Sequence, residues 1–149
     1  MAYEQLKLQN QLSFSLYAAS RLVIQEYQPY LEKLGITYPQ YLVLMVLWET
    51  DSISVSEITH RLLLNTNTIT PVLKRLEAQG IITRQRSQED ERKVIVTLTP
   101  KGKQMQMEAA SLPEKLVASL VSSNVKIEEL QTLKDQLYMI IHYLSNKQA

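Results

Sequence analysis

Cysteine is absent from the 149-residue sequence, and glycine and proline are scarce, with three and five residues. Without cysteine the chain has no disulfide, no thiolate zinc site and no thiol nucleophile. The few glycines and prolines, with many Leu, Gln, Glu, Lys and Ala residues, favour helices, because straight-chain side chains lose little rotamer freedom there. Apolar residues make up 45% of the chain, enough for one packed core. We therefore expect a mainly α-helical single domain.

Long apolar runs and catalytic motifs are also missing. No stretch approaches the roughly 18 apolar residues that cross a bilayer, and residues 1–11 do not combine a basic patch with an apolar stretch. The histidines, His60 and His142, have no partner at metal-ligand spacing, and there is no Gly-rich phosphate loop or nucleophile motif. We expect a cytoplasmic protein that binds no membrane, metal or cofactor and is not an enzyme.

Basic residues are concentrated in one segment, although the net charge is only +1. Residues 74–103 contain eight of the 16 Lys and Arg residues, against four acidic residues. Residues 1–73, more than twice as many, contain four basic and six acidic residues. A local basic segment in a nearly neutral chain is typical of a nucleic-acid contact surface.

Apolar spacing predicts two helices in the first third of the chain. Steps of three, four and seven predict one long amphipathic helix over about 8–34, which Gly35 can end in a left-handed conformation. Residues 38–49 are apolar on nearly all sides, with Pro39 in the first turn, where proline is tolerated. The second helix should be buried, with Met45 and Trp48 in the core.

A helix-turn-helix pattern follows. Ser54 and Glu57 match a capping box, which predicts a short helix to about residue 63. A second amphipathic helix is predicted over about 66–79, with Gly80 just past its end. Pro71 lies near its second turn and predicts a late helix start or a slight kink.

The remaining segments complete the predicted fold. Residues 81–86 and 93–98 alternate as two strands joined by a polar tip, which predicts a β wing. Thr99 and Pro100 open another helix that Pro113 should end or kink. The last helix, over about 127–145, has apolar residues at the spacing of a helix–helix seam: Leu130, Leu133, Leu137, Ile140 and Leu144.

We therefore predict a winged helix-turn-helix with a two-stranded β wing and with dimerisation helices at both ends of the chain. The first and last helices are too long to bury both faces in so small a monomer, and a homodimer would cover them. Residues 37–112 form the predicted DNA-binding region, and residues 1–36 and 113–149 form the predicted dimerisation helices.

The candidate DNA contacts lie on the second helix of this motif and on the wing. Small polar residues allow a helix to approach base edges in the major groove, and Lys or Arg reach phosphates. Arginine near the tip of a hairpin suits the minor groove. The candidates are Asn67, Thr68, Thr70, Pro71, Lys74, Arg75, Arg84, Arg86, Arg92 and Lys93. A solvated charged helix face, or an exposed hairpin with Asp90 paired to Arg92, would give the same pattern, and such a pair could also position Arg92.

One long stretch carries a family resemblance. NTITPVLKRLEAQGIITRQRSQEDERKVIVTLTPKG resembles the recognition helix and wing of the MarR family of bacterial regulators, including its Asp-x-Arg wing signature at Asp90 and Arg92 and its Leu-Thr close at Leu98 and Thr99. LQNQLSFSLYAASR followed by ITYPQYLVLMVLWE is similar to the organic-hydroperoxide-sensing OhrR branch of that family. The resemblance covers nearly the whole chain.

The OhrR resemblance implies a sensor site and also shows where this chain departs from it. The branch has a reactive cysteine in the element QLCF, assisted by tyrosines; Ser13 takes the cysteine position, and Tyr17, Tyr27 and Tyr38 match the tyrosines. A serine hydroxyl does not ionise near neutral pH and is not oxidised by peroxide as a thiol is. Peroxide sensing is therefore disabled in this chain, by engineering or by natural loss, and the tyrosines have dimer packing as an alternative role.

The resemblance implies a dimeric repressor on a pseudo-palindromic DNA operator, with an organic hydroperoxide as effector of a cysteine-containing form and a peroxide-detoxifying enzyme as its regulated gene. Residues 65–67 replace the Asp-Ser-Gly run common in the branch, which leaves the operator sequence open. The alternatives are a MarR-type repressor released by a small phenolic ligand and a winged-helix protein-interaction module.

Overall fold

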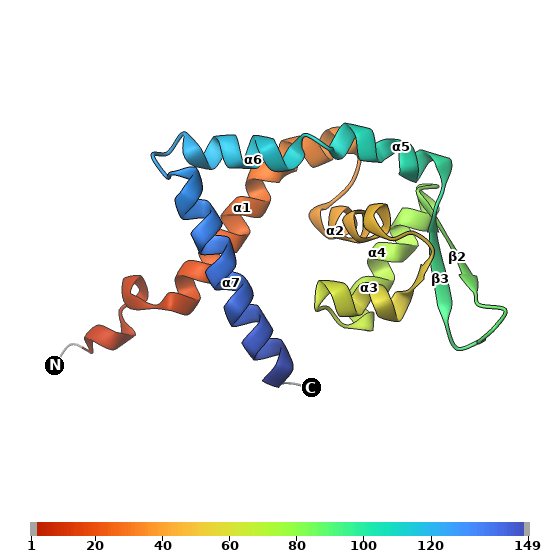
Figure 1. Ribbon diagram of the computed structural model, residues 1–149, viewed down its shortest axis with the longest axis horizontal. Helices are drawn as coiled ribbons and strands as arrows, with labels where there is room; N and C mark the ends of the chain where they lie inside the picture. Colours follow the sequence, from red (N-terminus) through yellow and green to blue (C-terminus); the bar gives the residue numbers. More distant parts are fainter. Residues whose placement is uncertain (1–2, 148–149) are drawn as a thin grey trace.

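The computed structural model describes residues 3–147 and has a helical fold with one small sheet (Figure 1). Two short 3-10 turns, η1 (Glu4–Leu6) and η2 (Leu8–Asn10), precede the first helix. The helices are α1 (Leu12–Leu34), α2 (Tyr38–Glu49), α3 (Val55–Leu62), α4 (Thr66–Ala78), α5 (Pro100–Ala109), α6 (Leu112–Val121) and α7 (Ile127–Lys147). The strands are β1 (Ile53–Ser54), β2 (Ile82–Arg86) and β3 (Val94–Leu98).

The elements form a compact lobe and an extended arm. Helices α2, α3 and α4 and the sheet gather in the lobe (Figure 1). Helix α5 runs along one side of the lobe, and the arm beyond it consists of α1, α6 and α7. Helix α1 contacts both α2 and α6. The Ser119 hydroxyl of α6 donates to the Glu26 carboxylate of α1 at 3.0 Å, and the Lys115 ammonium lies 4.8 Å from the centre of the Tyr30 ring.

The core lies in the lobe, around α2. The largest fully buried side chains are Leu44, Leu47, Ile58, Ile69, Leu73, Leu76, Ile81, Ile82, Val43 and Val96. Met45 and Trp48 pack against this cluster, and the Trp48 indole donates to the carbonyl of Gly102 at 2.9 Å. The predicted buried helix is confirmed, and Met45 and Trp48 lie partly buried at the edge of the core. The described part of α7 has no buried residue, so this helix contributes nothing to the core.

The helix ends follow the sequence signals with three corrections. Gly35 ends α1 with φ at 72°, as predicted. Helix α1 begins at Leu12 and not near residue 8, because Lys7 and Gln11 have extended backbones that separate the two 3-10 turns from it. Ser54 caps α3, but the predicted capping box is incomplete, because the Glu57 carboxylate pairs with Arg61 at 3.0 Å.

The third correction concerns α4. This helix begins at Thr66 with Asn65 as its cap, so Pro71 does not delay the helix start. Proline lacks a backbone N–H, and within the helix Pro71 leaves one interior carbonyl without its usual donor. Helix α5 ends at Ala109, four residues before Pro113, in line with the predicted end or kink. Pro113 itself lies in the first turn of α6, a helix that the sequence analysis did not separate.

The predicted wing strands are confirmed, and the sheet has one further strand. Strands β2 and β3 pair antiparallel from Ile82 opposite Leu98 to Arg86 opposite Val94. The short β1 pairs with the other edge of β3, which gives the order β1-β3-β2. Two residues are too few to show strand alternation, so sequence pattern could not predict β1.

A glycine at the start of α5 allows the helix to lie against the base of the wing. A Cβ on Gly102 would overlap the backbone oxygen of Ile81 and lie 3.0 Å from Leu98 Cδ2. We expect Gly102→Ala to lower the free energy of unfolding by about 1–3 kcal/mol, because the Ile81 carbonyl, just before β2, accepts from the Thr99 N–H at 3.0 Å and cannot move aside cheaply. Urea unfolding measures this change. The neighbouring, exposed Lys103→Ala is the control, and equal stability of the two variants would contradict the prediction.

Among residues 3–147, no helix is long and apolar enough to cross a membrane. The same residues contain no group of His, Cys, Asp and Glu side chains that is placed to bind a metal ion.

Candidate nucleic-acid interface

Helix α4 buries one face and exposes a polar one. Ile69, Leu73 and Leu76 are buried, whereas Asn67, Thr68, Pro71, Lys74 and Arg75 are exposed. The Asn65 side chain accepts hydrogen bonds from the backbone N–H of Thr68 at 2.9 Å and from its hydroxyl at 3.0 Å. The Thr70 hydroxyl donates to the carbonyl of Thr66 at 2.8 Å. The exposed face therefore carries small groups at its N-terminal end, where the Thr68 and Thr70 hydroxyls are held by Asn65 and Thr66, and basic groups farther along.

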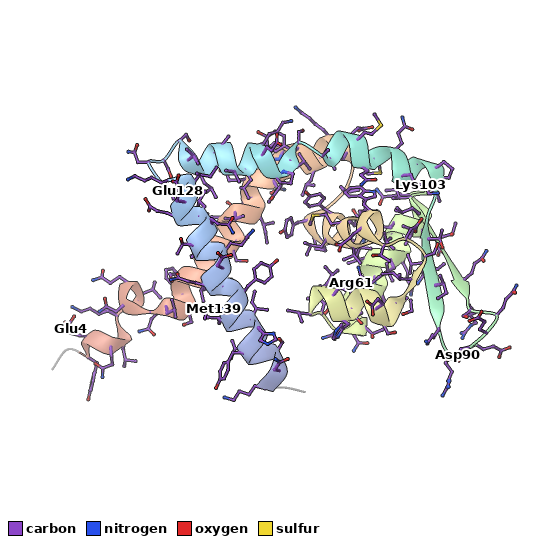
Figure 2. All side chains as sticks on the ribbon, viewed as in Figure 1. Glu4, Arg61, Asp90, Lys103, Glu128 and Met139 are labelled. Atoms are coloured by element: carbon purple, nitrogen blue, oxygen red, sulfur yellow. The ribbon has the colours of Figure 1, made fainter. Side chains whose placement is uncertain are left out.

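The wing tip is closed by its own hydrogen bonds. The Ser87 N–H donates to the Lys93 carbonyl at 2.8 Å, and the Lys93 N–H donates to the Asp90 carbonyl at 2.9 Å. The Ser87 hydroxyl accepts from the N–H groups of Glu89 and Asp90. Figure 2 shows Asp90 at the far end of the wing, away from the helices.

Asp90 orients Arg92 without burying it. One oxygen of the Asp90 carboxylate accepts from the backbone N–H of Arg92 at 3.1 Å and from its Nε at 3.2 Å. The Arg92 side chain is still 91% exposed. An exposed ion pair contributes little to stability, so this guanidinium remains available to a phosphate or a base.

The other wing cations differ in their surroundings. Arg86 Nη1 donates to the carbonyl of Glu91 at 2.9 Å, across the wing tip, and both Arg86 and Lys93 are exposed. Arg84 instead pairs with Glu77 of α4 at 3.0 Å, with only 22% of its side chain exposed. This bond to Arg84 is the main reason why the pKa of the Glu77 carboxyl lies below its usual value. Arg84 thus ties the wing to α4, which spacing along one strand could not show.

Two of the four predicted sensor residues lie together. The rings of Tyr27 and Tyr38 have centres 5.5 Å apart, and Tyr41 lies 5.7 Å from the first and 6.1 Å from the second. Burial raises the pKa of Tyr38 and of Tyr41. The pKa of Tyr27 is raised to about 12, first by burial and then by the nearby phenols of Tyr41 and Tyr38. Tyr41 was missed in the sequence analysis, although it lies one helical turn after Tyr38.

Ser13 and Tyr17 lie elsewhere. They are exposed and one turn apart near the start of α1, and the Arg21 guanidinium carbon lies 5.9 Å from the centre of the Tyr17 ring. At about 1.5 Å per residue, the 14 residues from Ser13 to Tyr27 span roughly 21 Å of helix. Within one chain the structure therefore does not bring Ser13 to the Tyr27–Tyr38 pair.

The tyrosine cluster predicts an alkaline loss of stability. A phenol whose pKa is about 12 in the folded chain and 10.0 when unperturbed binds its proton more tightly when folded. Its contribution is fully present below pH 10 and is lost as the pH rises toward 12, because only the unfolded chain ionises there. Urea unfolding from pH 9 to 12 should show this fall, and Tyr27→Phe should make it shallower. Identical slopes for the two proteins would contradict the assignment.

The chain matches known transcription regulators over most of its length. Residues 25–109 match the family model described as transcriptional regulator SarA/Rot. The organic hydroperoxide resistance transcriptional regulator of Bacillus subtilis is 43% identical over 145 residues, 97% of each chain. The regulator MgrA of Staphylococcus aureus is 36% identical over 93% of each chain.

A solved structure supports the same assignment. Reduced AbfR bound to DNA is 42% identical over 95% of this chain and 96% of its own, with a TM-score of 0.74. AbfR has also been solved from Staphylococcus epidermidis, at 39% identity and a TM-score of 0.72. The winged-helix fold and the family resemblance seen in the sequence are both confirmed. The chain therefore belongs to the SarA/Rot-like, MarR-type family of transcriptional regulators, and it is not an enzyme.

Proposed function

We propose that this chain is a repressor that binds a pseudo-palindromic DNA operator as a homodimer. The observation that carries this proposal is the combination of an exposed polar face on α4 with a projecting wing whose tip presents Arg92 beside Asp90. A relative of known structure, AbfR, has been solved on DNA, which supports the same partner here. The cytoplasm, where bacterial DNA is accessible, is the expected location.

In this proposal each basic element has a separate role. The N-terminal part of α4 enters the major groove, where Asn67, Thr68, Thr70 and Pro71 approach base edges and Lys74 and Arg75 contact phosphates. The wing enters the minor groove through Arg86, Arg92 and Lys93. Arg84 acts indirectly, because its pair with Glu77 holds the wing at a set position relative to α4.

The exposed apolar surface of the arm supports the homodimer. Large apolar side chains that solvent reaches on α1 and on the seam side of α7 include Leu12, Phe14, Leu16, Leu22, Leu133, Ile140, Ile141 and Leu144. So much apolar surface on two helices is unusual for a monomer and is expected at an interface. A two-fold interface covers the same patch on both subunits. We assign residues 1–36 and 113–149 to dimerisation and residues 37–112 to DNA binding.

The test of DNA binding uses a duplex selected by this protein from a random library. Fluorescence anisotropy then compares the selected duplex with a scrambled one over a range of salt concentrations. We expect preference for the selected duplex and a steep fall in affinity with salt, because phosphate contacts release counterions. Equal affinity for both duplexes at every salt concentration would refute sequence-specific binding.

The sensor site is proposed to form across the dimer. Ser13 lies roughly 21 Å of helix from Tyr27 in the same chain, so a site that contains both needs a second copy of α1. The relative from Bacillus subtilis is named for organic hydroperoxide resistance. In the sequence resemblance to the OhrR branch, Ser13 takes the position of the reactive cysteine. This chain keeps the tyrosines but lacks the group that peroxide oxidises.

Ser13→Cys is expected to restore peroxide sensing. The thiolate would be oxidised by an organic hydroperoxide such as cumene hydroperoxide, and affinity for the selected duplex should then fall at least about tenfold, the lower range of an allosteric coupling. The unchanged chain, treated in the same way, should keep its affinity. Fluorescence anisotropy before and after peroxide measures both. The exposed Ser15→Cys, two residues away, is the matched control.

A small phenolic ligand is the second candidate effector. A pocket of about 280 Å³ lies beside Tyr38, between α1 and the start of α2, with Ile24, Leu31 and Ile36 among its lining residues. If Ser13→Cys is oxidised and keeps its DNA affinity, while a phenolic acid raises the melting temperature and releases DNA, this alternative replaces the peroxide proposal.

A further inference from the structure

Two glutamine side chains join the C-terminal end of α4 to the α1–α2 corner. Gln40 is 3% exposed, in the first turn of α2, and Gln79 is the residue that caps the end of α4. The Gln40 amide nitrogen donates to the Gln79 side-chain oxygen at 2.8 Å. The two residues are 39 positions apart in the sequence, so only the fold brings them together.

Backbone groups fix the direction of both amides. The Gln40 side-chain oxygen accepts from the N–H of Thr37 at 2.8 Å, which leaves its nitrogen to face Gln79. The Gln79 nitrogen donates to the carbonyl of Gly35 at 2.8 Å. The chain of three hydrogen bonds therefore starts and ends at the corner between α1 and α2, and Gln79 is held by it. Because the buried Gln40 amide has its hydrogen bonds satisfied in this position of α4, positions of α4 that break these bonds are disfavoured.

The same end of α4 is also held from α5. The Lys101 ammonium donates to the backbone carbonyl of Gln79 at 2.9 Å, and the Thr99 hydroxyl donates to the carbonyl of Gly80 at 2.6 Å. The buried face of α4 is apolar, formed by Ile69, Leu73 and Leu76, and apolar packing is not directional. The hydrogen bonds of the Gln79 side chain to Gln40 and Gly35 are directional, and they therefore orient α4 in a way that apolar packing alone does not.

We propose that the Gln40–Gln79 pair is a positioning device that sets the angle at which α4 meets the DNA bases. This inference rests on the proposed DNA-binding function. Hydrogen bonds to base edges need a set helix orientation, whereas phosphate contacts by long Lys and Arg side chains tolerate small displacements. Loss of the Gln40–Gln79 pair therefore reduces sequence-specific binding and leaves non-specific binding in place.

The test compares Gln79→Met, Gln40→Met and the double variant on the selected and scrambled duplexes. Methionine keeps the length of the side chain and removes its hydrogen bonds. Each single variant should weaken binding to the selected duplex about tenfold, and the double variant should be little worse than either, since the pair acts as one unit. Binding to the scrambled duplex should stay within about twofold. Gln104→Met, an exposed glutamine on α5, is the matched control.

Urea unfolding separates positioning from folding. Gln79 lies at the surface, so Gln79→Met is expected to fold even if the buried Gln40→Met is destabilised. Gln79→Glu keeps an oxygen for Gln40 but cannot donate to Gly35, and it should resemble Gln79→Met. The inference is overturned if folded Gln79→Met binds the selected duplex as the unchanged chain does, or if it loses affinity equally for both duplexes. If the unchanged chain does not prefer the selected duplex, the proposed function fails first, and this inference fails with it.

Discussion

Replacing Arg92 with alanine is expected to weaken binding to the selected duplex by about 1–3 kcal/mol, roughly 5- to 150-fold in Kd. The Arg92 side chain is 91% exposed, and its ion pair with Asp90 holds it in position at the tip of the wing. In the minor groove the guanidinium would meet a strongly negative potential, which alanine cannot use. Fluorescence anisotropy at a fixed salt concentration measures the loss.

The controls for Arg92→Ala separate a specific contact from a general loss of charge. Lys126→Ala removes one positive charge from an exposed position between α6 and α7, away from the wing (Figure 1). It should bind DNA as the unchanged chain does. Both variants should unfold at nearly the same urea concentration as the unchanged chain, because exposed pairs contribute little to stability. Equal affinity of Arg92→Ala and the unchanged chain would remove the wing from the proposed interface.

The double variant Ile140→Asp/Leu144→Asp is expected to be monomeric and to bind the selected duplex at least about 100-fold more weakly. Both side chains are 40% or more exposed on α7 and lie on the predicted helix–helix seam. In a homodimer the two substitutions place four unpaired carboxylates in an apolar interface, which is strongly unfavourable. A monomer contacts only one half-site and loses the gain from simultaneous binding of two. Sedimentation velocity and anisotropy measure the two effects.

A matched variant on the other face of α7 tests whether the seam is the interface. His142 and Asn146 are exposed and, at 100° per residue, point away from Ile140 and Leu144. His142→Asp/Asn146→Asp adds the same charges and should remain dimeric. If the seam variant stays dimeric and keeps its affinity, the proposed dimerisation surface is wrong.

Local sequence signals predicted most of the fold. Helix α2 has the predicted bounds, Gly35 ends α1 as expected, and β2 and β3 lie within one residue of their predicted bounds. These features depend on spacing, caps and turns within a few residues. The predicted start of α1 was wrong, because the extended residues Lys7 and Gln11 interrupt the helix while the apolar pattern continues through the 3-10 turns. Strand β1 was missed because pairing with β3, not its own two residues, makes it a strand.

The contacts of the candidate site also fall into those that local sequence could predict and those that it could not. The Asp90–Arg92 contact could be expected from sequence because the two residues are two positions apart. The Arg84–Glu77 pair joins a strand to a helix. The Gln40–Gln79 pair joins two helices 39 residues apart. Spacing along one chain gives no signal for such contacts, since tertiary packing creates them. The DNA-contacting roles themselves remain predictions, and the experiments above address them residue by residue.

The most direct test of the central proposal is a hydroxyl-radical footprint of this protein on its selected duplex. Two recognition helices in successive major grooves and two flanking wings should protect a pattern with two-fold symmetry, with half-sites centred about one helical turn, 10–10.5 base pairs, apart. Arg92→Ala should lose the outer, minor-groove protections first. A single asymmetric protected site, or uniform weak protection without sequence preference, would contradict a dimeric operator-binding regulator.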